Sequence, residues 1–273
     1  MRNTVRCIVA FALVVSATGV PAMNRSCETK AGAAGCLQLI SLQIARAAEL
    51  ASSGNEDAYV SLDALQGRGA ELLGLLAEHE KSGAHRELAT VQSSWKELTA
   101  DIAKILDNKA SVVGAIETGH TVDARIREIS VRLDQALGDL KDGSGPAAEA
   151  VAASRMIQLT YRMQRRAQLL IHGGEDSESA STGLRRDVAY FGKSLAGLIN
   201  GDADLNLKKV HDQSVRQLLV DVNESWPEVA TAISKLLDFA SALETSRNAA
   251  EQAQLDSETF MLRADDLMAL GGK

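Results

Sequence analysis

The chain contains little proline and few aromatic residues. Only three of its 273 residues are proline, and aromatic residues make up 3%. Ala, Leu, Glu, Gln, Lys and Arg dominate, and their side chains lose little rotamer freedom in a helix. Hydrophobic residues reach 45%, which is enough for a packed core. The composition therefore predicts an all-α fold.

Sequence patterns that position catalytic groups are also missing. There is no Gly-x-Ser-x-Gly, no Gly-x-x-x-x-Gly-Lys and no His-Glu-x-x-His. Glu117 and His120 form one Glu-x-x-His pair, whereas di-iron bundles need two such pairs and two further glutamates. We therefore expect a protein that is not an enzyme and has no cofactor. A metalloenzyme bundle, which would hold stoichiometric iron or manganese, is the alternative.

Basic charge is scarce as well. The net charge is −7, and no cluster of Lys and Arg is interleaved with aromatic residues. Nucleic-acid-binding proteins normally carry a basic stripe. The sequence thus argues against a nucleic-acid partner.

The first 22 residues differ from the rest of the chain. Arg2 and Arg6 precede an apolar run from Cys7 to Val20, and Val20-Pro21-Ala22 offers the small residues that a signal peptidase cuts after. The run is shorter than the roughly 20 residues of a membrane span. We expect a cleaved signal peptide over 1–22 and a periplasmic or exported product. An uncleaved N-terminal anchor is the alternative.

Two cysteines remain after such a cleavage, Cys27 and Cys36. In an exported chain, a cysteine pair separated by a short loop favours a disulfide. Metal binding by two thiols without a third ligand is the poorer alternative.

The rest of the chain repeats one helical pattern. Apolar residues recur at spacings of three and four, which is typical of helices packed on other helices. Gly54 and Gly173 end matching helices 119 positions apart, and the only two tryptophans, Trp95 and Trp226, lie 131 positions apart. We therefore predict an elongated molecule of two tandem antiparallel helical-bundle modules, over 23–141 and 147–270.

Irregularities are expected within the two longest helical runs. The heptad register of the run from Leu88 to Leu140 slips around Thr118–Thr121. Pro227 lacks an N–H group, so we expect it to kink or divide the corresponding run in the second half.

Three motifs carry a family resemblance. They are Ser41-Leu42-Gln43-Ile44-Ala45-Arg46 with its stop at Gly54, the Ser94-Trp95 helix, and Thr160-Tyr161-Arg162-Met163. Together they resemble the periplasmic sensory region of PilJ-type pilus chemotaxis transducers, which is similar in turn to the sensor domain of NarX-type nitrate kinases. The resemblance covers about residues 37–270. It implies stacked helical bundles and a role in sensing or surface signalling.

The candidate ligand-binding residues lie mainly in the two copies of the first motif. A cationic cluster at a helix interface holds small anions by charge-assisted hydrogen bonds. The alternative is that each arginine is solvated or paired with an acidic side chain. The candidates are Arg155, Arg162, Arg165, Arg46 and Gln43, with Arg166 in the same run.

The resemblance also implies two arginines five positions apart in a nitrate site. Gln38 and Gln43 occupy these positions in the first copy, and Ile157 and Arg162 occupy them in the second. Neither copy keeps both arginines, so nitrate binding is not expected to carry over.

Complete transducers of this type continue into a second membrane span and a cytoplasmic methyl-accepting hairpin. Because no such segments follow here, we expect a sensor-like domain without its own output module. The leading hypothesis is an exported domain of pilus chemotaxis type that binds a small ligand or a pilus or receptor protein. The alternative is a structural adaptor bundle that pairs with another helical protein, including a homodimer through the long helices.

Overall fold

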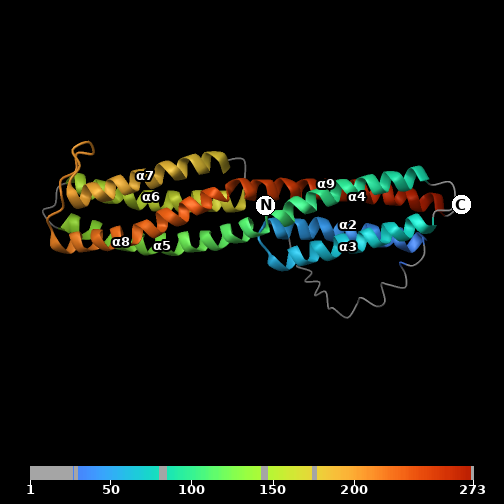
Figure 1. Cartoon of the computed structure of the whole chain (residues 1–273). Helices are drawn as coiled ribbons and strands as arrows, with labels where there is room; N and C mark the ends of the chain where they lie inside the picture. Colours follow the sequence, from blue (N-terminus) through green and yellow to red (C-terminus); the bar gives the residue numbers. More distant parts are fainter. Residues whose placement is uncertain (1–26, 28–29, 80–84, 143–146, 174–176, 272–273) are drawn as a thin grey trace, which may run out of the picture.

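The computed structural model describes residues 27, 30–79, 85–142, 147–173 and 177–271. Within these ranges the chain forms helices and no strands, and the helices pack into an elongated arrangement (Figure 1), which confirms the predicted fold class. The helices are α2 (Lys30–Ser52), α3 (Glu56–His79), α4 (His85–Asp107), α5 (Lys109–Asp142), α6 (Ala147–His172), α7 (Ser177–Asn200), α8 (Gln213–Asp238) and α9 (Ala240–Gly271).

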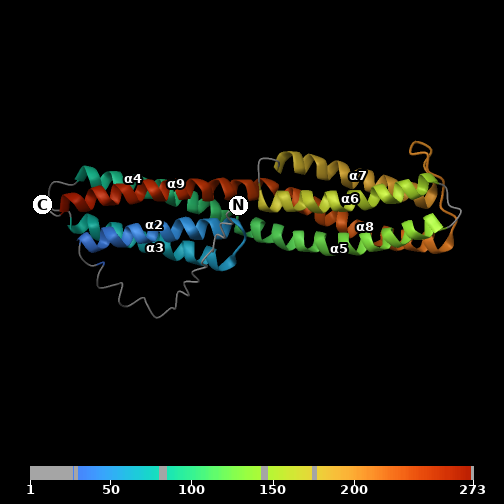
Figure 2. The ribbon, with the colours of Figure 1, turned by 180° about the vertical axis from the view of Figure 1, so that it is seen from behind.

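The helices group into two bundles that lie end to end. The first bundle contains α2, α3, α4 and α9, and the second contains α5, α6, α7 and α8; the views from front and back agree on this grouping (Figures 1 and 2). Each bundle has its own apolar core. The core of the first bundle contains residues up to Ile105 and again from Ala249 onwards. The core of the second bundle contains residues between Val112 and Leu243.

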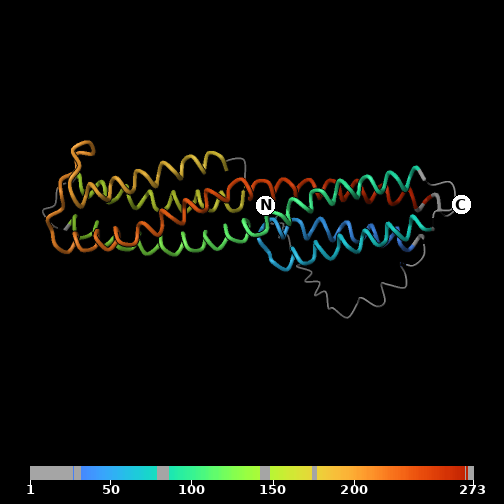
Figure 3. Tube along the Cα trace, viewed as in Figure 1, coloured from blue at the N-terminus to red at the C-terminus, as the bar shows by residue number. Residues whose placement is uncertain are grey.

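These bundles cut across the ranges expected from the sequence repeat. Following the chain in Figure 3, α4 leads directly into α5 and α8 leads directly into α9, so that both pairs cross from one bundle to the other. The packing units are therefore 30–107 with 240–271, and 109–238, rather than the contiguous halves 23–141 and 147–270. The contiguous ranges describe the duplication of the sequence, while α5 and α9 pack with the helices of the other half.

The two crossings are interrupted at equivalent places. Asn108 separates α4 from α5, and Phe239, 131 positions later, separates α8 from α9. The Asn108 side chain donates to the Lys104 carbonyl over 2.7 Å and so competes with the helical hydrogen bond to that carbonyl. The helices continue through 118–121 and through Pro227, so the expected division at Pro227 is wrong.

Glycine ends α2 and α6, as the repeat predicts. Gly54 has φ of 86° and Gly173 has φ of 80°, a left-handed conformation that side-chain-bearing residues rarely adopt. A Cβ at Gly54 would overlap Ile116, and one at Gly173 would overlap Arg247. Ile116 and Arg247 are themselves 131 positions apart, so the contacts at the junction of the bundles follow the repeat.

The Cys27 and Cys36 side chains are joined in a disulfide, with their Cα atoms 6.0 Å apart. The bond ties residue 27 to the first turns of α2. The predicted signal peptide, 1–22, lies outside the described residues. Among the helices that the structure describes, none combines the length and the apolar character needed to cross a membrane.

A pair of carboxyl groups lies between α4 and α9 of the first bundle. Burial raises the pKa of Asp256 above its ordinary value of 3.8, and the nearby Asp101 and Glu97 raise it further against the lowering effect of the Gln252 hydrogen bond. A raised folded-state pKa means that protonated Asp256 favours folding. This contribution is complete below the unfolded pKa and is lost as the pH rises through the folded pKa.

We therefore expect Asp256→Asn to raise the thermal midpoint at neutral pH by a few degrees, and to have little effect near about pH 4. The amide keeps an acceptor for Gln252 and removes the repulsion from Asp101. Thermal unfolding followed by circular dichroism over this pH range measures the effect. Asp134→Asn, at an exposed position of α5, is the control; an equal gain from both variants contradicts the prediction.

Candidate functional site

One face of α6 carries three arginines towards α7. Arg155, Arg162 and Arg166 are spaced by seven and four residues, and these spacings place side chains on the same side of a helix. The antiparallel helix α7 packs beside this face and contributes Asp187. The site is therefore formed by two adjacent helices of the second bundle.

Asp187 holds two of these arginines in place. Its side chain is only 2% exposed and accepts from Arg162 Nη2 over 2.6 Å at Oδ1, while Arg166 Nη1 donates to Oδ2. Arg166 Nη1 also donates to the Gly183 carbonyl over 3.0 Å. A Cβ at Gly183 would overlap the Arg166 guanidinium, so a larger residue here would displace that side chain. The two guanidinium partners offset part of the desolvation cost of this buried carboxylate.

An open groove runs along this face, and we call it the α6–α7 groove. Its central depression has a volume of about 490 Å³. A flanking depression of about 380 Å³ shares Arg186 with the centre, and another of about 210 Å³ shares Arg155 and Tyr190 with it. The central depression is lined by Arg155, Gln158, Leu159, Arg162, Arg186, Asp187 and Tyr190.

The groove has a surplus of positive charge. In its centre, three arginines stand against the single carboxylate of Asp187. Neither Arg155 nor Arg186 forms an ion pair with any residue that the structure describes. Half of the Arg162 side chain remains exposed, so it keeps donors free beyond its bond to Asp187. Guanidinium groups in this setting bind carboxylate or phosphate groups through paired hydrogen bonds.

Only some of the residues proposed from sequence lie in the α6–α7 groove. It brings Arg155 and Arg162 into one groove and places Arg166 at its edge. Arg165 is exposed on α6 and does not line the groove. Gln43 and Arg46 are exposed on α2, in the first bundle, and so belong to a different part of the molecule.

Sequence reasoning missed Asp187, Arg186 and Tyr190. Asp187 had a detectable signal, because it lies on the apolar seam of α7 between Leu184 and Phe191. An acidic residue at such a position indicates a buried ion pair. Arg186 and Tyr190 are exposed and gave no signal.

The cluster is confined to the second half of the repeat. At the same offset of 119, Gln43 and Ala47 correspond to Arg162 and Arg166. Leu62, Leu73 and Leu76 match Leu184, Leu195 and Leu198 at an offset of 122, which pairs Leu65 with Asp187. The first copy therefore has no charged counterpart of this cluster.

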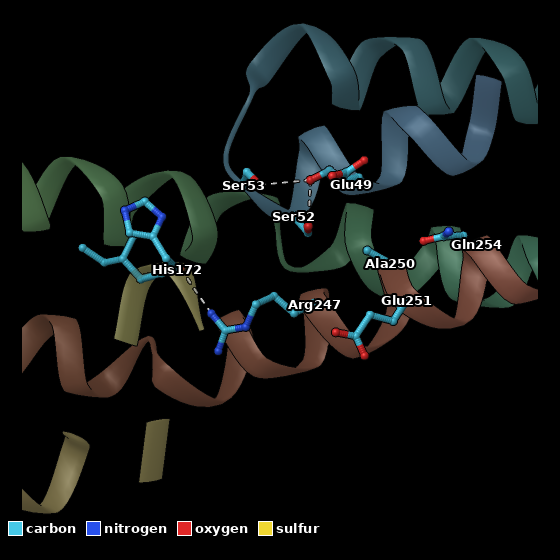
Figure 4. Close-up of a pocket in the computed structure, with 9 residues that line it drawn as sticks. Glu49, Ser52, Ser53, His172, Arg247, Ala250, Glu251 and Gln254 are labelled. Atoms are coloured by element: carbon cyan, nitrogen blue, oxygen red, sulfur yellow. Dashed lines mark hydrogen bonds between the residues drawn. The ribbon is translucent and has the colours of Figure 1, made fainter. Parts of the chain in front are cut away.

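A second depression lies where the two bundles meet, between the ends of α2 and α6 and the side of α9. Arg247 points towards the end of α6 (Figure 4) and donates through Nη1 to the carbonyls of Leu170 and Ile171 over 3.1 and 3.2 Å. Burial lowers the pKa of Arg247. These bonds satisfy carbonyl groups that a helix end leaves open, so Arg247 caps α6.

Comparison with known proteins gives two relatives of one kind. No protein-family model matches the chain. It is 26% identical over 233 residues to "Putative methyl-accepting chemotaxis AlkN" of Alcanivorax borkumensis, which covers 85% of the chain and 33% of the relative. It is 23% identical over 244 residues to "Protein PilJ" of Pseudomonas aeruginosa, covering 86% of the chain and 36% of the relative.

The predicted resemblance to PilJ-type transducers is thus confirmed over most of the chain, which spans about a third of the length of these relatives. Among solved structures, the TorS sensor domain in its complex with TorT covers 90% of this chain, with a TM-score of 0.46 and 11% identity.

Proposed function

We propose that the chain is the sensing module of a chemotaxis system of the pilus type, and that it recognises an anionic ligand in the α6–α7 groove. The proposal rests on Arg155 and Arg186, which lie beside the buried Asp187 cluster. Neither arginine forms an ion pair with a residue that the structure describes. The similarity to chemotaxis proteins supports the sensing role. The proposed module is not an enzyme; it acts by binding alone.

The groove is suited to this role because one of its donors, Arg162, is preorganised. Asp187 fixes Arg162 through a bond of 2.6 Å, so this guanidinium loses little further freedom when a ligand binds. Arg155 and Arg186 then supply charge that no acidic residue in the described part of the chain pairs with. A carboxylate entering between them gains charge-assisted hydrogen bonds without displacing an internal partner.

Action outside the cytoplasm is part of the proposal. The sequence at 1–22 has the features of an export signal, and a disulfide such as Cys27–Cys36 persists in oxidising compartments. N-terminal sequencing of the protein from the periplasmic fraction tests this point. A chain that keeps residues 1–22 and is found in the cytoplasm contradicts it.

Arg186→Gln is expected to weaken binding of citrate, a polycarboxylate probe, by about tenfold, because it removes one charge-assisted pair. Isothermal titration calorimetry measures the change. Arg165→Gln is the matched control, because Arg165 is exposed on α6 and does not line the groove, and it should bind citrate like the unmodified protein. Equal losses of citrate binding in the two variants contradict the proposal.

A second candidate function is partner binding through the outer face of α2. Leu39, Leu42 and Leu50 are exposed on this helix, and Leu42 reaches 52% exposure. Gln43 and Arg46 lie among them, also exposed. Exposed apolar stripes of this kind mark protein interfaces. The adaptor and homodimer hypotheses both need such a surface.

If α2 pairs two copies of the chain, sedimentation velocity will show a dimer that Leu42→Glu abolishes. Val60→Glu, an exposed apolar position on α3, is the control for the effect of added charge. A monomer at all concentrations contradicts pairing through this surface.

A further inference from the structure

We infer that the α6–α7 groove binds an extended acidic stretch of polypeptide rather than a single small anion. This inference rests on the proposed function, because it names the ligand class of the same site. It goes beyond that function because it specifies the length of the ligand and the order of apolar and acidic groups along it.

The first argument is the length of the groove. Its lining runs along α6 from Ala148 to Arg166, which is about 27 Å at about 1.5 Å per residue. Arg155 and Arg162 lie two helical turns apart, or about 10 Å along the axis. One carboxylate reaches only one of these two arginines. An extended peptide of about eight residues, at about 3.3 Å each, spans the whole groove.

The second argument is the change of chemistry along the groove. At the end near the loop 202–210, the apolar side chains of Val151, Leu205 and Leu207 lie beside the polar groups of Ser194 and Asn206. The centre carries the unpaired cations Arg155 and Arg186. A ligand that matches both regions has an apolar side chain at one end and carboxylates after it. Small polycarboxylates have no group that packs against the apolar side chains of Val151 and Leu205.

The third argument is the supply of neutral hydrogen-bonding groups. Gln158 lies in the centre, Ser194 and Asn206 lie at the end near the loop 202–210, and Ser179 and Thr182 lie beside Glu178 at the opposite end. A peptide presents a backbone donor and acceptor at every residue. Amide and hydroxyl groups distributed along the whole groove match this repeating pattern, whereas a compact anion would need donors gathered at one point.

The test uses the full chain and a fluorescein-labelled peptide, Leu-Ala-Asp-Ala-Asp-Ala-Asp-Ala, with binding followed by fluorescence anisotropy. The matched peptide has Asn in place of each Asp. We expect the acidic peptide to bind and the Asn peptide to bind about tenfold more weakly or less. Arg155→Gln and Arg186→Gln should each weaken the acidic peptide by a similar factor, while Arg165→Gln should not.

Val151→Ser separates a peptide site from a small-anion site. Val151 is 49% exposed, so the change leaves the fold intact, which circular dichroism verifies. It should weaken peptide binding and leave citrate binding unchanged, because only the peptide reaches Val151. If citrate binds and the peptide does not, the inference is overturned while the proposed function stands. If neither ligand binds, both are overturned. Equal binding of the acidic and Asn peptides also overturns the inference.

Discussion

Asp187→Ala is expected to lower the free energy of unfolding by about 3 kcal/mol, because it removes the shared partner of two arginines. Arg166 has only 22% of its side chain exposed and would keep its charge without a carboxylate beside it. Arg162 is half exposed and can turn to solvent, so most of the loss comes from Arg166. Equilibrium denaturation in urea, followed by far-ultraviolet circular dichroism, measures the change.

The first half of the repeat supplies the control for this variant. Its residues at the corresponding positions are Gln43, Ala47 and Leu65. The triple variant Arg162→Gln, Arg166→Ala, Asp187→Leu copies them into the second bundle and removes the charges of this cluster. We expect it to recover most of the lost stability, since apolar replacements of buried ion pairs are often neutral. A triple variant as unstable as Asp187→Ala would contradict this account of the cluster.

Gly69→Ala is expected to cost about 2 kcal/mol, because a Cβ at this position overlaps the ring of Trp95. Trp95 is buried and packs against Phe260 with ring centroids 5.4 Å apart, so it has little freedom to move away. In the second bundle, Trp226 instead stacks on Phe191 at 4.2 Å. Thermal unfolding gives the loss of stability, and tryptophan fluorescence reports the displaced ring.

Gly74→Ala is the matched control on the same helix. Its added Cβ meets no atom within 4 Å, so the change removes a flexible residue from α3 without a clash. We expect a gain of about 0.5 to 1 kcal/mol. If Gly69→Ala is as stable as Gly74→Ala, then the close contact with Trp95 does not constrain the fold.

The sequence alone could predict the helices and their duplication, because both are local properties. The spacing of the apolar residues, and the helix ends at Gly54 and Gly173, follow from the order of residues. The exchange of α5 and α9 between bundles could not be predicted. The apolar periodicity is the same on both sides of Asn108 and Phe239, so it does not say which neighbours each helix meets. The effect of Pro227 was overestimated, since α8 accommodates it on an exposed face.

The candidate site could be predicted in part. Arg155 and Arg162 lie on one helix at a spacing of seven, so their common face follows from sequence. Asp187 and Arg186 lie on α7, and their meeting with these arginines depends on how α7 packs against α6. Arg46 and Gln43 were included because the motif repeats. The structure shows that the duplicated motif has kept its helix but not its charges.

The central claim is that ligand recognition takes place in the α6–α7 groove of the second bundle. Nuclear magnetic resonance of the arginine Nε–Hε groups during titration with citrate and with the acidic peptide tests it most directly. We predict saturable shifts of Arg155, Arg162 and Arg186, while Arg46 on α2 and Arg165, which does not line the groove, stay unchanged. Shifts centred on Arg46, or no saturable shift at the three groove arginines, would contradict the claim.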